Sequence, residues 1–230
     1  MIQNLQGVLY IINLINGKMR TPKINALYKM IDWLNISQLN ENKKQKLPLD
    51  KSPIASNSWL SGFIDTDGCF SIKGFTPNKK TYPSFQFYLC QREIDKNGES
   101  FKSLFEIIAN YLHVFLKLRV ISGHSQFNIT TSSLKSNMFL INYLNHFPLF
   151  TSKYLNYIDW KNATELFYAK AKGKKKRCPR GYFLNKYGEI PCISKKKHKE
   201  LKVYEEIKKL KFNMNKYRQN FNWDHLIHFY

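Results

Sequence analysis

The feature that most constrains the fold is the stretch Trp59-Leu60-Ser61-Gly62-Phe63-Ile64-Asp65-Thr66-Asp67-Gly68, in which an apolar helix ends in two carboxylates and a glycine. A helix C-terminus carries a partial negative charge, so acidic side chains there are disfavoured by about 0.3–1 kcal/mol each. A compensating cation is therefore expected, and a bound divalent metal would supply it. Gly68 is expected to take the left-handed conformation that closes the helix, before Cys69–Lys73 alternates like a strand. The two carboxylates are thus expected at a helix-to-strand corner.

The net charge of the chain indicates what kind of molecule it binds. The formal net charge of +21 predicts a polyanion, because such a field attracts phosphate backbones and opposes compact folding without them. Nucleic acid is the leading candidate, with anionic lipid, or solubility through charge alone, as the alternatives. No segment is long enough to span a membrane. The four cysteines lack a CxxC pair, which indicates neither a disulfide framework nor a zinc ribbon and favours a reducing compartment; they are Cys69, Cys90, Cys178 and Cys192.

The nine residues Leu60–Gly68 resemble, position by position, the LAGLIDADG motif of homing endonucleases and the related group I intron maturases. The departures, at Ser61, Phe63 and Thr66, roughly keep size and polarity class. The resemblance covers essentially the whole chain and extends to fungal mitochondrial intron-encoded members through Leu49–Ile54 and Phe221–Leu226. It implies an α+β fold of the LAGLIDADG homing endonuclease type, with the element order αββαββα.

An internal repeat suggests how the chain is divided. Residues 1–36 resemble a later part of the chain, and because two-motif members of the family fuse two repeats, they look like the C-terminal remnant of a first repeat whose motif helix is missing. A chance match between two Asn/Lys-rich helices is the alternative. Residues 37–48 are interpreted as a linker, and residues 49–230 as one complete LAGLIDADG domain with a basic C-terminal extension. The matching segments are Ile12–Asn16 with Ile141–Asn145, Thr21–Lys23 with Thr151–Lys153, and Ile31–Trp33 with Ile158–Trp160.

Periodicity and capping residues predict the elements. The motif helix is expected from about Asn57 to Asp67, with Ser56 or Asn57 as its N-cap. Two hairpins are expected, from Cys69–Phe75 with Ser84–Arg92 and from Leu116–Ile121 with Gln126–Thr130, the second turning at Ser122-Gly123. Further helices are predicted from Ser100 to His113, from Ser132 or Ser133 to Asn145, from Thr151 to Ala169, and from about Lys199 to Lys211.

The resemblance implies metal-assisted phosphodiester hydrolysis with Asp67 as the direct carboxylate ligand of Mg²⁺. Such a hard cation polarises a phosphoryl oxygen and lowers the pKa of bound water. By the same resemblance, Lys153 borders the scissile phosphate and activates the solvent network, Lys23 is its counterpart from the first repeat, and Gln91 organises water near the metal. Solvated side chains are the alternative for all three. A cation beside the phosphate also stabilises charge on the transferring oxygens.

The motif helix carries a stripe of small residues. Ser58, Ser61, Gly62 and Asp65 lie three or four apart on one face, which lets another helix approach closely. In the family that partner is the corresponding helix of a second repeat or subunit, and Asp65 supports the corner or this helix interface. Family members assemble two acids to cut both strands, whereas this chain supplies one. A double-strand break would then require a homodimer or a missing first half.

Strand Ser84–Arg92 has two distinct faces. Phe85, Phe87, Leu89 and Gln91 share one, and Gln86, Tyr88, Cys90 and Arg92 share the other. We expect the second face to read DNA, because Gln and Arg make paired hydrogen bonds to A and G and a two-stranded ribbon fits the major groove. An ordinary solvated sheet face is the alternative. The predicted DNA contacts are Lys73, Gln86, Tyr88, Arg92, Lys117, Arg119, Gln126 and Asn128, with the basic runs Lys172–Arg177 and Lys195–Lys197 as further candidates unless they are solvated loops.

The leading hypothesis is a site-specific DNA endonuclease of the homing type, encoded in a mitochondrial intron and acting on double-stranded DNA at an intron insertion site. The alternative is a maturase that binds group I intron RNA and assists splicing without cleavage. The motif cannot separate them, because its helix can be kept for packing after catalysis is lost, and the missing first motif favours a maturase or an inactive copy. Richness in Asn, Lys, Ile, Tyr and Phe fits an AT-biased organellar gene, and the apolar run Val8–Ile15 lacks the preceding basic residue of a signal peptide.

Overall fold

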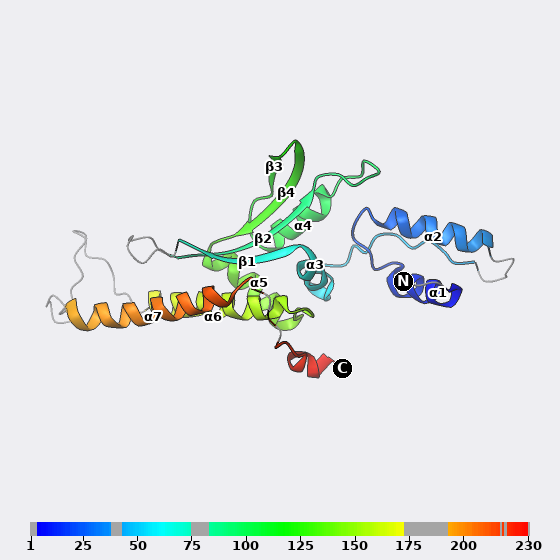
Figure 1. Cartoon of the computed structure of the whole chain (residues 1–230). Coiled ribbons are helices and arrows are strands. Elements are labelled where there is room, and N and C mark those ends of the chain that lie inside the picture. The colour runs from blue at the N-terminus through cyan, green and yellow to red at the C-terminus, as the bar shows by residue number, and fades with distance from the viewer. Residues whose placement is uncertain are drawn as a thin grey trace. The chain divides into compact units, whose positions relative to one another are not determined.

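The structure is a computed structural model that describes residues 4–37, 43–74, 83–172, 193–216, 218 and 220–229 (Figure 1). The chain forms two compact units. The first comprises Met1–Asn57, Cys90–Tyr111 and Phe115–Ile129, and the second comprises Ser58–Leu89, Leu112–Val114 and Thr130–Tyr230. Within the residues that the structure describes, no helix has both the length and the apolar character needed to cross a membrane.

The element order confirms the α+β prediction. The run α3 (Trp59–Asp67), β1 (Gly68–Lys73), β2 (Ser84–Arg92), α4 (Lys102–Tyr111), β3 (Lys117–Ile121), β4 (His124–Thr131) and α5 (Leu134–His146) is αββαββα. One four-stranded sheet has the order β1-β2-β4-β3, in which the pairs β1/β2 and β3/β4 are antiparallel. The predicted turn between β3 and β4 is present, with positive φ angles of 50° at Ser122 and 78° at Gly123.

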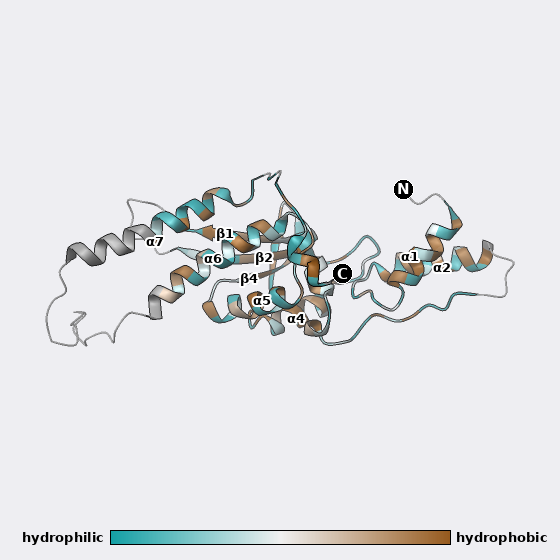
Figure 2. Ribbon diagram, turned by 90° about the horizontal axis from the view of Figure 1, so that it is seen from below, coloured by the Kyte–Doolittle hydropathy of each residue, from teal (hydrophilic) through white to brown (hydrophobic). Residues whose placement is uncertain are grey.

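In the first unit, α1 (Leu5–Ile15) and α2 (Ile24–Ser37) pack on each other around a small core. The core residues are Ile12, Leu27, Ile31 and Leu34, each at most 3% exposed. Asn4 caps α1, because its Oδ1 accepts a hydrogen bond from the N–H of Gly7 at 2.7 Å. Hydrophobic residues of α1 and α2 are brown in Figure 2.

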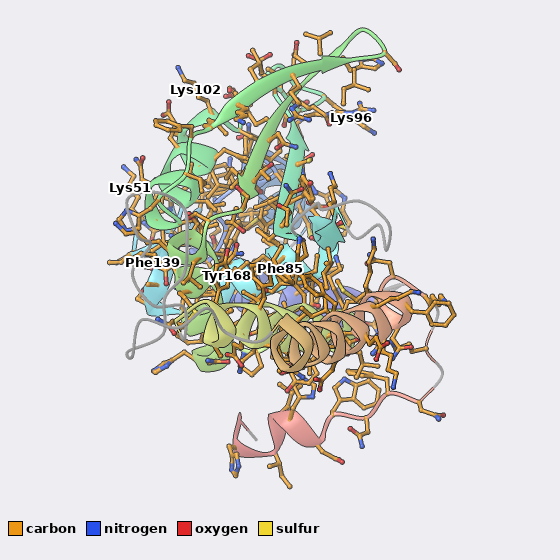
Figure 3. The ribbon with its side chains drawn as sticks, turned by 90° about the vertical axis from the view of Figure 1, so that its left-hand side faces the viewer. Lys51, Phe85, Lys96, Lys102, Phe139 and Tyr168 are labelled. Carbon is orange, nitrogen blue, oxygen red and sulfur yellow. The ribbon has the colours of Figure 1, made fainter. Side chains whose placement is uncertain are left out.

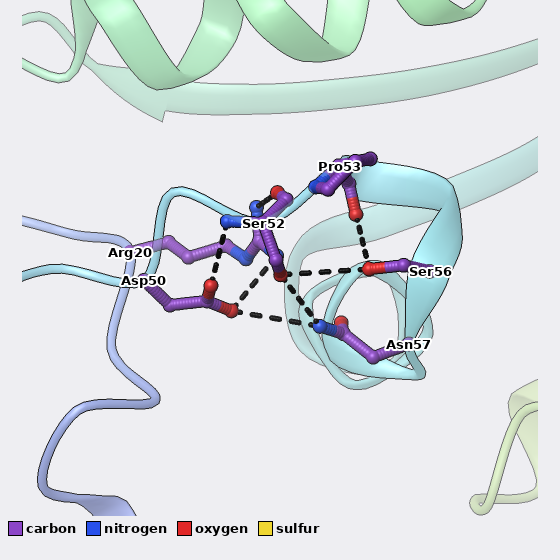
Figure 4. Close-up of polar contacts among 6 residues, drawn as sticks. All are labelled: Arg20, Asp50, Ser52, Pro53, Ser56 and Asn57. Atoms are coloured by element: carbon purple, nitrogen blue, oxygen red, sulfur yellow. Dashed lines mark hydrogen bonds and ion pairs between the residues drawn. The ribbon is translucent and has the colours of Figure 1, made fainter.

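The segment after α2 is fastened to this helix pair. The side chain of Asn16 bonds the backbone of Gln45 and Leu47 at 2.8 and 3.0 Å, and Lys46 forms an ion pair with Asp32 at 2.7 Å. Arg20, only 6% exposed, pairs with Asp50 at 2.8 Å and donates to the carbonyl and hydroxyl oxygens of Ser52 (Figure 4). The Ser52 N–H is the main cause that lowers the pKa of Asp50, and the Arg20 charge acts in the same direction.

In the second unit, α6 (Lys153–Lys172) packs on one face of the β1–β2 hairpin. The ring centroid of Phe70 lies 5.5 Å from that of Tyr157 and 5.3 Å from that of Trp160. Phe85 lies 5.4 Å from Phe167 and 6.2 Å from Tyr168 (Figure 3). The predicted alternation in β2 is confirmed, since Phe85, Phe87 and Leu89 are buried. The second unit also contains α7 (Ile193–Asn213), which lies beside α6, and the 3-10 helix η2 (Asp224–Phe229). The 3-10 helix η1 (Ile54–Ser56) belongs to the first unit.

Two predictions about the motif helix are wrong. The helix begins at Trp59 with Ser58 as its N-cap, because the side chain of Asn57 is bonded to Ser52 and Asp50 instead of capping the helix (Figure 4). Gly68 is not left-handed: its φ of −78° and ψ of 152° are those of extended backbone. Glycine is required there by close packing, since a Cβ would lie 2.8 Å from Ile64 O and 3.0 Å from the Phe87 ring.

Other boundaries move by a few residues. β1 begins at Gly68, β4 at His124 and α7 at Ile193, all earlier than predicted. β3 begins at Lys117, one residue later than predicted. The end of the predicted first strand at Phe75, the basic residues 173–177, and Cys178 and Cys192 lie outside the described residues. The side chains of Lys172 and Lys195–Lys197 also lie outside that description.

Candidate active site and nucleic-acid interface

The side chain of Lys153 occupies the helix-to-strand corner. Its Nζ donates to the carbonyl oxygens of Gly68 at 2.7 Å, Ile64 at 3.0 Å and Thr66 at 3.3 Å. Ile64 and Thr66 lie in the last turn of α3, whose C-terminal end carries partial negative charge, and Gly68 follows as the first residue of β1. The cation expected at this corner is therefore supplied by the chain itself, so a metal is not needed to compensate the helix end.

Burial and charge act oppositely on this ammonium group. Desolvation lowers the pKa of Lys153 from its ordinary value of 10.5, while electrostatic interactions with Asp65, Cys69 and Asp67 oppose that shift. Lys153 is thus electrostatically coupled to both motif carboxylates. Since Lys153 opens α6, the first turn of that helix joins the end of α3 at one corner.

The carboxylate of Asp65 binds the backbone that leads into α6. It accepts hydrogen bonds from the Phe150 N–H at 2.6 Å, from the Thr151 hydroxyl at 2.7 Å and from the Thr151 N–H at 3.4 Å. Free N–H groups at a helix N-terminus attract anions, which offsets the unfavourable position of Asp65 near the end of its own helix. Of the two roles expected for Asp65, this geometry is that of corner support.

Ser61 holds the same loop, residues 147–151, which we call the corner loop. Its hydroxyl donates to the carbonyls of Phe147 and Pro148, the latter at 3.1 Å, and its N–H donates to the Tyr143 hydroxyl at 3.2 Å. Ser58 and Gly62 are exposed instead, and a Cβ placed on Gly62 would meet no atom within 4 Å. Of the four residues predicted at a helix interface, Ser61 and Asp65 bind within their own unit, and Ser58 and Gly62 leave an open face of α3.

Asp67 is the last residue of α3 and is exposed. Across the described ranges, no group of three or more His, Cys, Asp or Glu side chains could hold a metal ion. Asp65 is bonded to the corner loop, and Asp67 is the exposed carboxylate of the corner. That donor set fits Mg²⁺, which is commonly bound through one or two carboxylates and takes further oxygens from water and substrate phosphates.

Gln91 and Lys23 belong to the first unit, whereas Asp67 and Lys153 belong to the second. Gln91 is partly exposed near the end of β2, and its Oε1 accepts a hydrogen bond from the Arg92 N–H at 3.0 Å. Lys23 is exposed directly before α2. Of the four predicted catalytic residues, the structure joins Lys153 to the helix end that carries Asp67.

The β1–β2 hairpin presents polar side chains on the face opposite its core. Gln86 lies opposite Ser71, and Tyr88 lies opposite the exposed Cys69. The Lys73 ammonium lies 4.6 Å from the centroid of the Tyr88 ring, a cation–π distance. Gln86 and Tyr88 are partly exposed and Lys73 is exposed, so this face can meet a ligand from solvent.

The β3–β4 hairpin places basic and amide side chains opposite one another. Arg119 pairs with Gln126 and Lys117 with Asn128, and facing residues of an antiparallel pair share one side of a sheet. Lys117, Arg119 and also Arg92 are exposed, and Gln126 is partly exposed. Asn128 differs from the expectation of a solvent-facing residue: it is 5% exposed and its amide donates to Cys90 Sγ at 2.8 Å.

Sequence reasoning missed the partners that hold the corner. It did not foresee that Phe150 and Thr151 would bind Asp65, although a Thr shortly after Pro148 and at the predicted start of a helix is a recognisable signal for side-chain capping. It also missed the buried Arg20–Asp50 pair, for which the spacing of the two residues offers no signal.

Residues 60–164 match the model of a protein family described as "LAGLIDADG endonuclease". This range contains the motif helix, the sheet and the first part of α6, and therefore Asp67 and Lys153.

Two relatives are fungal proteins. Intron-encoded DNA endonuclease aI3 of Saccharomyces cerevisiae is 28% identical over 189 residues, covering 69% of this chain and 46% of that protein. The uncharacterized cox1 intron-2 37.2 kDa protein of Schizosaccharomyces pombe is 28% identical over 163 residues, covering 70% and 47%. The chain thus spans about half the length of these relatives.

Among solved structures, the chain resembles the crystal structure of meganuclease I-SmaMI bound to uncleaveable DNA. The TM-score is 0.50 at 18% sequence identity, and the match covers 84% of this chain and 59% of that chain. At this identity the likeness supports the fold.

Proposed function

Because residues 60–164 belong to the LAGLIDADG endonuclease family, we propose that the protein is a site-specific DNA endonuclease of the homing type. Its substrate would be double-stranded DNA at an intron insertion site. The observation that carries this proposal is the corner at the end of α3, where Asp67 is exposed and the Lys153 ammonium is electrostatically coupled to it. An exposed acid at the end of the family's motif helix, with a lysine from α6 beside it, suits phosphodiester hydrolysis.

In this proposal Asp67 holds Mg²⁺ at the corner. When bound, the ion would polarise a phosphoryl oxygen and lower the pKa of a bound water. The three carbonyl contacts of Lys153 keep the end of α3 in place, and its positive charge favours the approach of a phosphate. Asp65 keeps the loop before α6 attached to the same helix, so that acid and ammonium are presented together.

The polar side chains of the hairpins are proposed to contact the DNA. Gln86 in the first hairpin, Gln126 in the second and Arg92 at the end of β2 carry the groups that make paired hydrogen bonds to base edges. Lys73 and Lys117 are exposed and would contact phosphates, which adds affinity without sequence preference.

Residues 1–36 are proposed to be the remnant of a first repeat. Both helix pairs begin their second helix alike, with Ile24 N–H bonded to Thr21 O at 3.1 Å and Tyr154 N–H to Thr151 O at 2.9 Å. The repeat matches Trp33 to Trp160, and these differ in burial: Trp33 is 55% exposed, whereas Trp160 is 0% exposed and packs on Phe70 of β1. The α1–α2 pair therefore exposes Trp33, whereas the matching Trp160 in the complete LAGLIDADG domain is covered by β1.

The difference in burial between Trp33 and Trp160 bears on where a second catalytic carboxylate would come from. In the complete copy, α5 and α6 already pack against their own α3 and β1 through Ser61–Tyr143 and Phe70–Trp160 contacts. A further helix-and-hairpin layer over α1–α2 would supply the second motif helix needed to cut both strands. We therefore favour a first LAGLIDADG half over a homodimer as the source of the second motif helix.

We also propose a mitochondrial intron as the location of the gene, since one relative carries the name of a cox1 intron protein.

The single motif helix in the described residues keeps the maturase as a second candidate. It would bind group I intron RNA through the same basic surface and cut nothing. The two candidates make different demands on Asp67: cleavage needs its charge, whereas packing and RNA binding do not, because its side chain is exposed at the helix end.

The deciding experiment incubates the protein with Mg²⁺ and DNA spanning the intron-less exon junction, beside a splicing assay on the intron RNA. Asp67→Asn should abolish cleavage and keep DNA binding, because it removes the charge that holds the metal while keeping the side-chain shape. Glu205→Gln, an exposed acid on α7, is the charge-matched control and should cut like the wild type. If Asp67→Asn cuts as fast as the wild type, the metal-ligand role must be abandoned. Splicing without cleavage would favour the maturase.

A further inference from the structure

After α7, the chain returns along the second unit toward the corner loop. Asn215 has a positive φ of 55°, which turns the chain, and its side chain donates to Phe70 O at 3.2 Å. Arg218 then forms an ion pair with Asp159 of α6. These contacts tie the C-terminal segment, which here means residues 215, 216, 218 and 220–229, to the first strand of the hairpin and to α6.

Two side chains of this segment bind consecutive carbonyls of the corner loop. Trp223 Nε1 donates to Phe150 O at 2.9 Å, and His225 Nε2 lies 2.8 Å from Leu149 O. A carbonyl oxygen can only accept, so His225 carries its proton on Nε2. The His225 ring also stacks on Tyr154, with ring centroids 3.6 Å apart and planes 7° apart, and Leu226 is 0% exposed.

The same two peptide units bind Asp65 through their other ends. The Leu149–Phe150 unit accepts from His225 at its oxygen and donates to Asp65 at its nitrogen, at 2.6 Å. The Phe150–Thr151 unit accepts from Trp223 and donates to Asp65 at 3.4 Å. A donor at the carbonyl polarises a peptide and strengthens the bond that its N–H makes, and it also stops the peptide plane from rotating. Both effects act on Asp65 from the C-terminal segment.

We propose that Trp223 and His225 are positioning residues for the motif corner. By holding two carbonyls of the corner loop, they aim the opposite N–H groups at Asp65. Asp65 thereby keeps the last turn of α3, and with it Asp67, in the position in which Lys153 binds the helix end. In this arrangement the C-terminal segment completes the site although it contributes no group that touches the substrate.

The cleavage test rests on the proposed endonuclease function. Trp223→Phe and His225→Phe each keep an aromatic ring but remove the donor. The net value of one hydrogen bond corresponds to a fall of about 2- to 10-fold in the single-turnover cleavage rate at saturating DNA. The dissociation constant for DNA should stay unchanged, because a loss confined to the corner acts on the rate and not on binding. His225→Gln, whose amide can donate, should recover part of the rate, and the exposed Ile227→Ala is the matched control from the same segment.

A second measurement does not depend on cleavage. Thermal melts compare Asp65→Asn, Trp223→Phe and the double variant; because both residues hold the same peptide units, the double variant should lose less melting temperature than the sum of the single losses. Asp65→Asn combined with Ile227→Ala should show simple addition. Additive losses for Asp65 and Trp223, or equal effects on rate and DNA affinity, would overturn the proposal. Coupled melts in a protein that cuts no DNA would leave the positioning intact and reject the endonuclease function.

Discussion

Asp65 and Asp67 stand two residues apart on one helix, and their surroundings differ in kind. Asp65 accepts hydrogen bonds from two N–H groups and one hydroxyl, whereas Asp67 is exposed at the helix end. The motif therefore combines a carboxylate that stabilises the corner with one that faces solvent. Two similar side chains are expected to respond in opposite ways to the same substitution.

Asp65→Asn should lower the free energy of unfolding by about 1–3 kcal/mol, because an amide group would turn one donor toward the N–H groups that Asp65 accepts from. Asp67→Asn should leave it unchanged or raise it by about 0.3–1 kcal/mol, since a charge unfavourable to the helix end is removed. Urea denaturation at neutral pH measures both. Equal losses for the two variants would contradict the division of roles.

The lysine at the corner should give stability a characteristic dependence on pH. Burial lowers the pKa of Lys153 in the folded protein below the 10.5 of the unfolded chain, so between these two values the unfolded chain binds more protons. Stability should therefore rise as the pH climbs through that window. Lys153→Met should lack this rise, whereas Lys208→Met, an exposed position on α7, should retain it. Denaturation midpoints between pH 8 and about 10.5 measure the difference.

At the level of single residues, the sequence offers Asp67 and Lys153 as candidates but does not reveal the groups that hold them. The motif marks the acid and its context marks the lysine, because both are side-chain identities. The groups that bind Asp65 and Lys153 are mostly backbone N–H and carbonyl groups, which every residue carries. No pattern of residue types can reveal which of them come together.

At the junction of α3 and β1, Gly68 lies so close to Ile64 and Phe87 that only glycine, which has no Cβ, fits without a clash. Gly68→Ala should destabilise the fold by about 1–3 kcal/mol, because its Cβ would lie 2.8 Å from Ile64 O and from Ile64 Cγ2. Gly62→Ala, six residues earlier and inside α3, should instead stabilise it by about 0.5–1 kcal/mol, since nothing lies within 4 Å of the added Cβ and Ala is the better helix former. Melting of the two variants measures this contrast, and a loss at both positions would contradict it.

The helices and strands were largely predictable, but their ends were not. Alternation revealed β2, and Ser133 marked the start of α5, where it caps the N–H of Ser136 at 3.1 Å. The start of α3 was misplaced because Asn57, a good capping residue, is used by Ser52 and Asp50 instead. Local sequence describes what a residue can do, and tertiary partners decide which of those uses is realised.

Across the whole molecule, the net charge of +21 should make DNA binding strongly salt-dependent. If about 6–10 phosphates are neutralised, the affinity should fall by about 10³–10⁵ between 50 and 200 mM salt. Lys73→Met should reduce the slope of log affinity against log salt by about one, as expected for a phosphate contact. Titrations at four or more salt concentrations measure the slope, and a flat dependence would contradict a nucleic-acid partner.

The sequence suggests the proposed repeat, but it does not predict that its two copies differ in burial. Trp33 and Trp160 end identical Ile-Asp-Trp tripeptides, and only the structure shows that Trp33 is exposed and Trp160 is buried. Burial depends on what lies over a helix, which the helix's own sequence does not record.

β3 lies at one edge of the four-stranded order and all five of its residues are exposed, including Leu118, Val120 and Ile121. An exposed edge with apolar side chains is a template for pairing with another copy, and charged residues on it are the usual protection. Here Lys117 and Arg119 give that protection by mutual repulsion between molecules. High salt, which would strip bound nucleic acid from a purified sample, screens the same repulsion. Preparations freed of nucleic acid should therefore precipitate most readily at the ionic strength that cleans them.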